Sequence, residues 1–445
     1  MKKNNDKRDN TGIALWNEAK KIIPGGSQLF GKRAELFLPE QWPTYYKKAK
    51  GVYMWDLDGR KLTDMSYMGI GCCLLGYADP DVDKAVKKVI DSGSMATLNC
   101  TEEVELAQVL LKIHPWAEMV RYARTGGEAM TIAVRLARAY SGKDKIAFCG
   151  YHSWHDWYLS ANLANNKNLD GQLIPGLEPK GVPRALSGVA LPFHYNKIEE
   201  LEKIVKENSD IGVIVVEPSR HQPPQEGFFE KVKEIAKRVG AVLIFDEVQI
   251  GWTSSVGGLH LEFGVNPDIV VYAKAIANGY PMAAILGTKG VMQKSQETFA
   301  SSTFWTERVG PAAALATIKK MQAKKIHVHI KKIGKLIQDG WKKAAIKYNL
   351  DITIGAGTFA KPEFSLNYGD QNQAIRTLLT QEMLKRGFVD MACVYVSYEH
   401  KESHVKKYMK AVDKVFAFIA DAIQKNEVII RLDGPIAHNR FKRLD

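Results

Sequence analysis

The stretch from Ala241 to Gly287 restricts the possible folds more than any other part of the chain. It begins with AVLIF, a short apolar run that is typical of a strand buried on both faces of a parallel sheet. Asp246 and Glu247 follow this run directly. Because ligands bind at the carboxyl ends of the strands in open α/β sheets, the two acids are candidate site residues.

A second buried run, DIVVY at residues 268–272, ends at Ala273 and Lys274. Burial beside Ala, Ile and Gly disfavours the charged lysine, so Lys274 is a candidate neutral amine that forms a Schiff base with a carbonyl group. A lysine that holds an aldehyde and an aspartate that keeps a pyridine nitrogen protonated together fit pyridoxal 5′-phosphate (PLP). For Asp246 or Lys274 taken alone, a helix-capping carboxylate or a surface lysine is the alternative.

The composition and charge of the chain argue against a nucleic-acid-binding or membrane protein. The chain has 445 residues and a net charge of +13, and its basic residues are dispersed apart from modest clusters. We expect this charge to favour solubility and anionic substrates rather than nucleic acid, because no nucleic-acid-binding motif is visible. The cysteines show neither metal nor disulfide spacing, and no apolar run is long enough to span a bilayer. The sequence predicts a cytoplasmic protein that binds no membrane.

A glycine-rich turn supplies a candidate phosphate site. Residues 120–123 are a plausible strand, and Thr125, Gly126 and Gly127 follow it before a predicted helix with an apolar face. Small residues let backbone N–H groups approach a phosphate, and the helix dipole favours the negative charge. A Gly-Gly pair before a helix is weak evidence alone, but PLP requires one such site.

Aromatic and imidazole side chains follow a third predicted strand. The run at residues 145–149 leads into Tyr151, His152 and His155. An aromatic or imidazole ring at a strand end can stack on a flat cofactor. His152 and His155 are an alternative metal pair, but no further ligands cluster near them, so we expect no metal site.

A fourth buried run, at residues 212–216, ends at Glu217. Strands that alternate with helices through this region predict a parallel sheet with right-handed crossovers. From about Lys325 the pattern changes to helices with basic faces and short strands, which indicates a second, smaller α+β domain.

These motifs together resemble the class III (ω-type) aminotransferases of PLP fold type I, and in particular the glutamate-1-semialdehyde 2,1-aminomutase type, from about Leu15 to about Ile423. The resemblance implies an α/β fold with a mostly parallel central sheet and helices on both faces. It places the large PLP-binding domain at residues 76–324. The two chain ends, residues 1–75 and 325–445, would form the smaller α+β domain.

The same resemblance implies roles around the cofactor ring. Lys274 forms the Schiff base, and Asp246 pairs with the pyridine nitrogen. Tyr151 stacks on the ring with His152 beside it. Gln249, in the DEVQ run, contacts the ring hydroxyl.

Further implied roles concern the phosphate and the assembly. Thr125, Gly126 and Gly127 match the family's phosphate loop, and Glu217 matches the acid of its Glu-Pro motif. Thr303 matches a threonine that reaches the phosphate of the neighbouring subunit's cofactor. The resemblance therefore implies a homodimer with shared active sites.

Several departures from the family pattern concern the substrate side. The phosphate loop usually carries Ser or Thr at the position of Gly127. The aminomutase usually has an aromatic residue near Ile70 and an arginine near Lys32. The run FWTERVGP, with Trp305 and Glu307, replaces the usual small, polar residues after the threonine. We therefore expect the cofactor machinery to be kept and these four positions, Lys32, Ile70, Trp305 and Glu307, to shape a different substrate site.

The expected function is amino-group transfer to a small carbonyl substrate, such as a sugar or a polar amino acid derivative. The closest alternative is an intramolecular aminomutase, which uses the same residues but needs no separate amino donor. A non-catalytic PLP-binding protein is a third alternative, which the loss of the loop hydroxyl at Gly127 slightly favours and the presence of Lys274, Asp246 and Tyr151 opposes.

Overall fold

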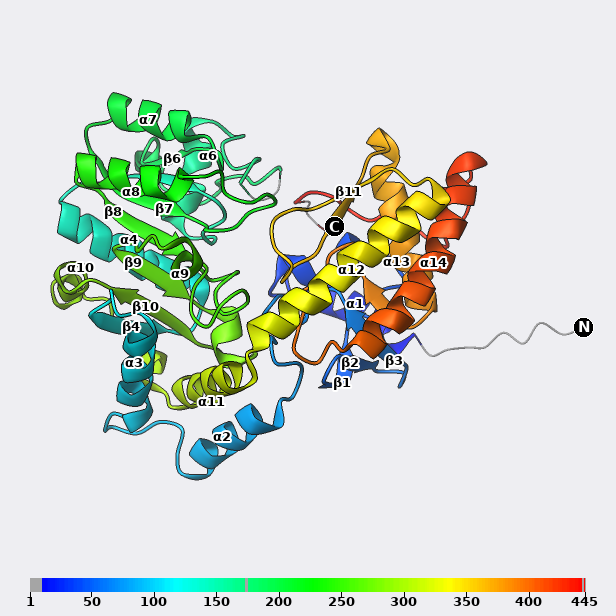
Figure 1. Ribbon diagram of the computed structural model, residues 1–445, viewed down its shortest axis with the longest axis horizontal. Coiled ribbons are helices and arrows are strands. Elements are labelled where there is room, and N and C mark those ends of the chain that lie inside the picture. The colour runs from blue at the N-terminus through cyan, green and yellow to red at the C-terminus, as the bar shows by residue number, and fades with distance from the viewer. Residues whose placement is uncertain (1–9, 173–174, 442–443, 445) are drawn as a thin grey trace, which may run out of the picture.

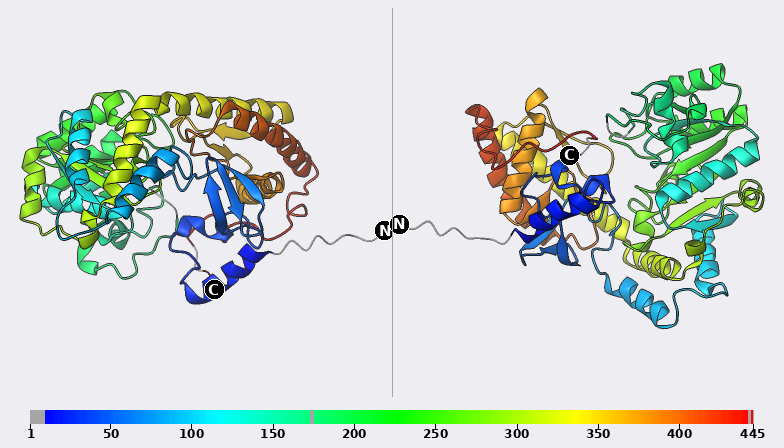
Figure 2. Two further views of the ribbon diagram at one scale, coloured as in Figure 1. Left: turned by 90° about the horizontal axis from the view of Figure 1, so that it is seen from below. Right: turned by 180° about the vertical axis from the view of Figure 1, so that it is seen from behind.

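The structure, a computed structural model, describes residues 10–172, 175–441 and 444. A large domain, on the left of Figure 1, contains the main sheet, and a small domain lies beside it. Both α1 (Thr11–Ile22) and α14 (Glu402–Gln424) lie in the small domain, as the two further views in Figure 2 also show. The domain boundaries at residues 75 and 324 stay predictions.

Within the described residues, the large domain contains a seven-stranded sheet in the order β4-β10-β9-β8-β7-β5-β6. Its strands are Met119–Ala123 (β4), Lys145–Cys149 (β5), Ala190–Pro192 (β6), Ile211–Val216 (β7), Val242–Asp246 (β8), Ile269–Tyr272 (β9) and Ala283–Gly287 (β10). Strands β6, β5, β7, β8 and β9 are mutually parallel, whereas β10 pairs antiparallel with both β9 and β4. The mostly parallel α/β sheet predicted from the sequence is confirmed.

Helices cover both faces of this sheet because alternate strand residues point to opposite faces. In β8, Val242 and Ile244 pack in the core under α4, whereas Leu243 and Phe245 pack in the core under α8. The core under α4 also contains residues of α5, α6 and α10, and the other core contains residues of α2, α3, α7 and α11. The helices of this domain are Pro80–Asp91 (α2), Thr101–Ile113 (α3), Gly126–Ser141 (α4), Asp156–Leu159 (α5), Ala161–Ala164 (α6), Ile198–Glu207 (α7), Phe228–Val239 (α8), His260–Phe263 (α9), Lys289–Gln293 (α10) and Val309–Lys324 (α11).

The small domain joins strands from both halves of the chain. Strands Tyr46–Lys50 (β1), Tyr53–Asp56 (β2) and Lys61–Met65 (β3) form an antiparallel meander, and Phe388–Asp390 (β13) pairs parallel with β3. A separate antiparallel pair consists of Ile352–Ile354 (β11) and Phe364–Leu366 (β12). The remaining helices are Ile326–Tyr348 (α12) and Asn372–Lys385 (α13), and α12 leads from α11 into the small domain in Figure 1.

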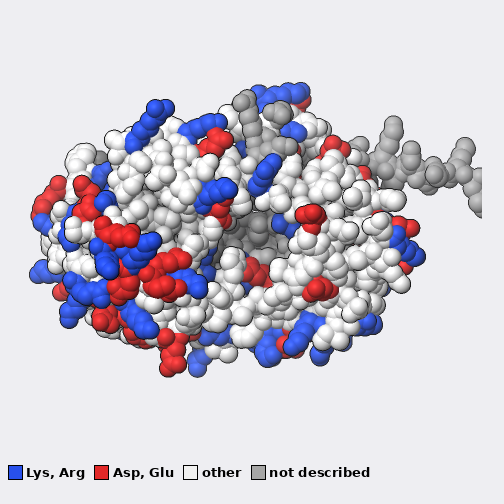
Figure 3. All heavy atoms as spheres, turned by 90° about the horizontal axis from the view of Figure 1, so that it is seen from above, with Lys and Arg blue, Asp and Glu red and all other residues white. Residues whose placement is uncertain are grey.

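Charged side chains of both signs are interspersed on the face seen from above in Figure 3, which agrees with the dispersed basic residues of the sequence. A hollow opens on this face between the two domains. Among the described residues, no helix combines the length and the apolar character that a membrane crossing requires.

Candidate active site

A cavity of about 490 Å³ lies where the parallel strands end. Tyr151 follows β5, Glu217 follows β7, Asp246 ends β8 and Lys274 follows β9. The fold therefore assembles the site from segments that are distant in sequence. The wall of the cavity contains these residues predicted to bind the cofactor: Thr125, Gly126, Gly127, Tyr151, His152, Glu217, Asp246, Gln249 and Lys274.

Asp246 is held in a fixed orientation by His152. The two side chains are buried, and Oδ2 of Asp246 lies 2.8 Å from Nδ1 of His152. Nε2 of His152 lies 3.2 Å from the carbonyl oxygen of Cys149. The other carboxylate oxygen of Asp246 accepts a hydrogen bond from the backbone N–H of Val248 at 3.0 Å. His152 thus lies in the cavity wall and ties the end of β8 to the segment after β5.

Glu247 points to the opposite face of the sheet, as the alternation of β8 requires. Its carboxylate accepts hydrogen bonds from the backbone N–H groups of Leu259 at 2.7 Å and His260 at 2.9 Å. Oε1 also lies 2.7 Å from Nδ1 of His260. Adjacent acids therefore have different tasks: Asp246 faces the cavity, whereas Glu247 organises the start of α9.

Lys274 is the lysine that lines the cavity. It follows β9 at the start of a short 3₁₀ helix, Lys274–Ala277, with a left-handed backbone at φ +48°. Burial lowers the pKa of Lys274 below that of an ordinary lysine, against the opposing effects of Cys72 and Asp246. Its Nζ donates a hydrogen bond to Oε1 of Gln249. Burial of Lys274 in the structure therefore explains why its amine is partly desolvated, as the sequence predicts.

The N-terminus of α4 forms an anion site at another wall of the cavity. Thr125 caps the helix: its hydroxyl accepts from the N–H of Glu128 at 3.3 Å and donates to the Glu128 carboxylate at 3.1 Å. Gly126 and Gly127 occupy the first turn, where no earlier carbonyl of the same helix can accept from their N–H groups. These amides and the helix dipole favour a bound anion such as a phosphate.

Glu217 is fixed by an arginine that the sequence analysis did not identify. Arg220 donates to Oε2 of Glu217, and the same oxygen accepts from the N–H of Tyr151 at 3.3 Å. The next residue, His221, places Nδ1 at 2.9 Å from Oε1 of Glu363 in the small domain. The loop after β7 therefore connects the cavity wall to the other domain.

Five predicted residues are absent from the cavity wall of the single described chain: Lys32, Ile70, Thr303, Trp305 and Glu307. Thr303 begins a short 3₁₀ helix and is exposed, so its reach to a neighbouring subunit stays a prediction. Lys32 contributes a positive charge near Cys72, a residue of the cavity wall. Ile70 has φ +61°, an unusual conformation for a β-branched residue.

Trp305 and Glu307 contact Arg124, which the sequence analysis also missed. The Arg124 side chain donates to the backbone carbonyls of Trp305 at 3.0 Å and Glu307 at 2.8 Å. Its Nε lies 2.7 Å from Oε1 of Glu307. The Glu307 carboxylate also accepts from the N–H groups of Val309 at 2.6 Å and Gly310 at 2.9 Å. Glu307 thereby caps α11 and neutralises Arg124, and its role in substrate choice stays a prediction.

The only sequence signal for these two arginines is their position. Arg124 directly precedes the cap residue Thr125, and Arg220 lies three residues after Glu217. Ser153, a further cavity residue, follows the predicted pair Tyr151 and His152. Their contacts depend on the fold rather than on local spacing, so the sequence alone did not identify them.

His152 and His155 point to different partners rather than to a common ion. His152 faces Asp246, whereas Nε2 of His155 lies 3.2 Å from the position that a β-carbon on Gly127 would take. In the part of the chain that the structure describes, no three His, Cys, Asp or Glu side chains are grouped to hold a metal ion.

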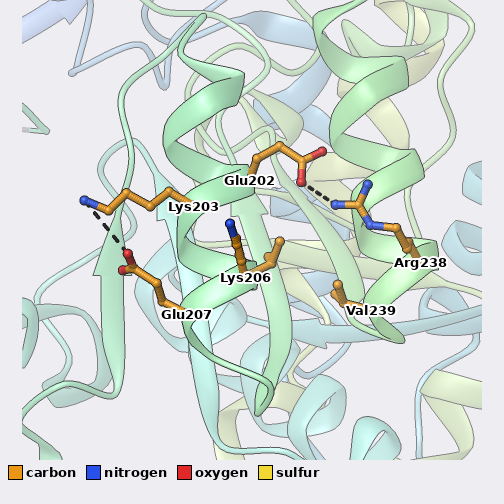
Figure 4. Close-up of a pocket in the computed structure, with 7 residues that line it drawn as sticks. Glu202, Lys203, Lys206, Glu207, Arg238 and Val239 are labelled. Atoms are coloured by element: carbon orange, nitrogen blue, oxygen red, sulfur yellow. Dashed lines mark hydrogen bonds and ion pairs between the residues drawn. The ribbon is translucent and has the colours of Figure 1, made fainter.

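The donor set of the cavity fits PLP. It combines a buried carboxylate that can face a ring nitrogen, an amine whose charge is disfavoured, and a helix N-terminus for a phosphate. Tyr151, 37% exposed, adds an aromatic ring to the wall. A separate depression between α7 and α8, shown in Figure 4, contains none of these groups, and its Glu202 and Lys203 pair with Arg238 and Glu207.

Comparison with known proteins points to one family. The family model "Aminotransferase class-III" matches residues 39–416. The chain is 34% identical over 323 residues to 3-aminobutyryl-CoA aminotransferase of Cloacimonas acidaminovorans, covering 71% of this chain and 73% of that protein. It is 31% identical over 432 residues to glutamate-1-semialdehyde 2,1-aminomutase of Ignicoccus hospitalis, covering 92% of this chain and 99% of that protein. The solved PLP internal aldimine form of the FumI protein of Sphingopyxis sp. MTA144 shares the fold, with a TM-score of 0.83, 23% identity and coverage of 93% of this chain and 97% of that one.

Proposed function

The chain belongs to the class III aminotransferase family and is therefore a PLP-dependent enzyme, and we propose that its acceptor is a small carbonyl compound, a sugar or a polar amino acid derivative. One observation carries the residue roles in this proposal. The Lys274 amine, the Asp246 carboxylate and the N-terminus of α4 line one cavity. They supply a covalent attachment point, a partner for the ring nitrogen and a phosphate site.

PLP, when bound, supplies an electron sink that makes a hydrogen on the carbon next to an amine acidic. We assign the proton transfer to Lys274. Burial disfavours its ammonium form, so its Nζ is available first to hold the cofactor aldehyde. With the cofactor and an amino donor bound, the same Nζ would be the group that takes the proton from the substrate carbon as general base and gives it back as general acid.

Asp246 stabilises positive charge at the ring nitrogen, and His152 keeps its carboxylate in position. Gln249 accepts a hydrogen bond from Lys274, which orients Nζ between the end of β9 and the segment after β8. Tyr151 closes one side of the cavity with its ring. These groups orient the cofactor, and no one of them is required to move a proton.

Four residues outside the cavity wall of the described chain set the choice of substrate in this proposal. A β-carbon on Gly71, next to Ile70, would lie 2.8 Å from Nε2 of Gln249 and 3.0 Å from Cδ1 of Tyr395. The backbone next to Ile70 therefore lies close to both Gln249 and Tyr395. Lys32, Ile70, Trp305 and Glu307 remain our candidates for substrate recognition.

We also propose a cytoplasmic homodimer with shared sites. All five cysteines are free, which is consistent with a reducing compartment. Thr303 is exposed on its own chain, so its hydroxyl is available to a neighbouring subunit. We expect the phosphate site to be complete only when Thr303 of one chain meets α4 of the other.

Intramolecular amino-group transfer is the second candidate, because a relative that carries the aminomutase name aligns over nearly the whole chain. The two activities differ in their need for a donor. An aminotransferase consumes one amino donor for each acceptor, whereas an aminomutase converts a single substrate.

The direct test is to load the protein with PLP and add candidate amines one at a time without an acceptor. A true donor converts the cofactor to its aminated form, which changes the absorption spectrum. Adding carbonyl compounds to the aminated protein then identifies acceptors by reversal of the spectrum. If no amine or carbonyl compound changes the spectrum of the loaded protein, the proposed transfer is wrong.

A further inference from the structure

We propose that the Ser153 hydroxyl binds the phosphate of the cofactor and replaces the side chain that Gly127 lacks. The inference rests on the proposed function, because it identifies the anion as the PLP phosphate. It assigns a binding role to a residue outside the glycine-rich loop. Three features of the site support it: the space around Gly127, the burial and backbone of Ser153, and the use of the other hydroxyl at the helix N-terminus.

Ser153 occupies the space beside Gly127. A β-carbon built on Gly127 would lie 3.1 Å from Cβ of Ser153 and 3.2 Å from Nε2 of His155. Both distances are tight for carbon contacts, so a larger residue at position 127 requires Ser153 or His155 to shift. The gap left by Gly127 is therefore filled by side chains from the segment after β5.

The Ser153 side chain is in a position to donate to a bound anion. Ser153 is 8% exposed and lines the cavity. Its Oγ accepts a hydrogen bond from the N–H of His155 at 3.4 Å. Among the described residues, no acceptor lies within hydrogen-bond distance of its own hydroxyl hydrogen. An anion in the cavity would supply an acceptor for this hydroxyl hydrogen.

The backbone at Ser153 is strained. Its φ is +103°, a region that glycine adopts readily and other residues rarely adopt. Strained conformations of this kind concentrate at functional sites, where surrounding structure maintains them. A glycine at position 153 would have no such strain, but it would lack the hydroxyl that serine places beside the helix N-terminus.

Thr125, the other hydroxyl at this end of α4, is already used within the protein. It donates to the Glu128 carboxylate at 3.1 Å as part of the helix cap. The first turn of α4 thus offers a phosphate its backbone amides, and Ser153 adds a side-chain donor. Hydrogen bonds to charged acceptors are stronger than those between neutral groups.

The test compares PLP with pyridoxal, which lacks the phosphate, in equilibrium binding to the apo-protein followed by tryptophan fluorescence. Ser153→Ala removes the hydroxyl but keeps the β-carbon and the strained backbone. We expect its dissociation constant for PLP to rise about tenfold or more, and that for pyridoxal to stay within about twofold. The matched control is Ser141→Ala at the other end of α4, which should leave both constants unchanged.

A second pair of variants tests whether a hydroxyl at position 127 can replace the hydroxyl at position 153. Gly127→Ser should weaken PLP binding because its side chain meets Ser153, and the double variant Ser153→Gly with Gly127→Ser should recover it. Recovery of PLP affinity in the double variant, beside a loss in Ser153→Ala, supports the assignment. Unchanged PLP affinity in Ser153→Ala, or equal losses for PLP and pyridoxal, overturns it while the proposed function stands. A wild-type protein that binds no PLP overturns both.

Discussion

Nδ1 of His152 lies 2.8 Å from Oδ2 of Asp246, and both residues are buried and line the cavity. The opposite nitrogen of the imidazole faces the carbonyl oxygen of Cys149. The carboxylate is therefore held by a ring that is itself fixed to β5. Removing the carboxylate and removing its support should have different effects.

We expect Asp246→Ala to retain part of its PLP affinity but to lose most of its turnover, because the ring nitrogen is no longer kept protonated. His152→Gln should lower kcat by a smaller factor, since the carboxylate remains but is less well oriented. Steady-state kinetics and PLP binding measured on both variants check these effects. Turnover of Asp246→Ala within a few-fold of wild type would show that Asp246 is structural.

The lysine assignment predicts a specific covalent label. Reduction of the PLP-loaded protein with borohydride should fix the cofactor to the peptide that contains Lys274, because Lys274 is the lysine on the cavity wall. Peptide mapping by mass spectrometry identifies the site. Lys274→Ala should be inactive but should keep the circular dichroism spectrum of the wild type. Recovery of the label on a different lysine would refute the assignment.

The shared-site proposal predicts complementation between two inactive variants. Thr303→Asp should be inactive because a carboxylate would face the phosphate, and Lys274→Ala is inactive because it lacks the amine. In a hybrid dimer, one site contains both lesions and the other is wild type. Activity should return on mixing, approaching half of the wild-type value per hybrid dimer. If subunit exchange is demonstrated and no activity returns, Thr303 serves only its own chain.

Substitution of Lys32 should change substrate kinetics, whereas substitution of Glu307 should lower the stability of the fold. Lys32→Ala should alter KM or kcat for the substrate and leave PLP affinity unchanged. Glu307→Ala should destabilise the fold by about 3 kcal/mol, because it leaves the largely buried Arg124 without its charge partner. Urea unfolding and substrate kinetics on both variants separate the two effects. Wild-type stability in Glu307→Ala would contradict the structural role.

Two buried histidines predict a loss of stability in mild acid. Burial lowers the pKa of His114 to about 4 and that of His400 to about 4, whereas the ordinary value is 6.5. The unfolded chain therefore takes up protons between pH 6.5 and 4 that the folded chain does not bind. Each histidine should remove up to about 3 kcal/mol from the free energy of unfolding as the pH falls through this window.

Urea unfolding between pH 7 and pH 4.5 measures this loss. His400→Gln should give a shallower dependence on pH than the wild type. A stability that does not depend on pH between 6.5 and 4.5 would be inconsistent with neutral, buried His114 and His400.

The sequence predicts the parts of the site that short segments determine. Asp246 and Lys274 each follow a buried apolar run, Gly126 comes shortly after strand β4, and the ends of neighbouring strands meet at one edge of the sheet. The sequence does not predict that β10 is antiparallel, because a buried apolar run has the same residue pattern in parallel and antiparallel strands. The two domains were expected from the change of pattern near Lys325.

The sequence also does not predict contacts between distant segments. Arg124 meets Glu307, and Ser153 approaches Gly127, only because the sheet brings separate loops together. Charge and size at a single position do not reveal such partners. A departure from the family pattern led to the prediction that Glu307 shapes substrate choice, and this stays a prediction. The contacts of its carboxylate with the N-terminus of α11 and with Arg124 are visible only in the structure.

The parallel pairing of β3 with β13, from Thr63 opposite Phe388 to Met65 opposite Asp390, bears on the synthesis of the chain. Strand β3 leaves the ribosome long before β13, and the entire large sheet is made between them. The large sheet can pack as its segments emerge. Meanwhile one edge of β3 has no partner, and an unpaired edge invites association with other chains. A nascent chain whose synthesis has not yet reached Phe388 would therefore hold a complete large sheet beside an open strand edge until its last part is added.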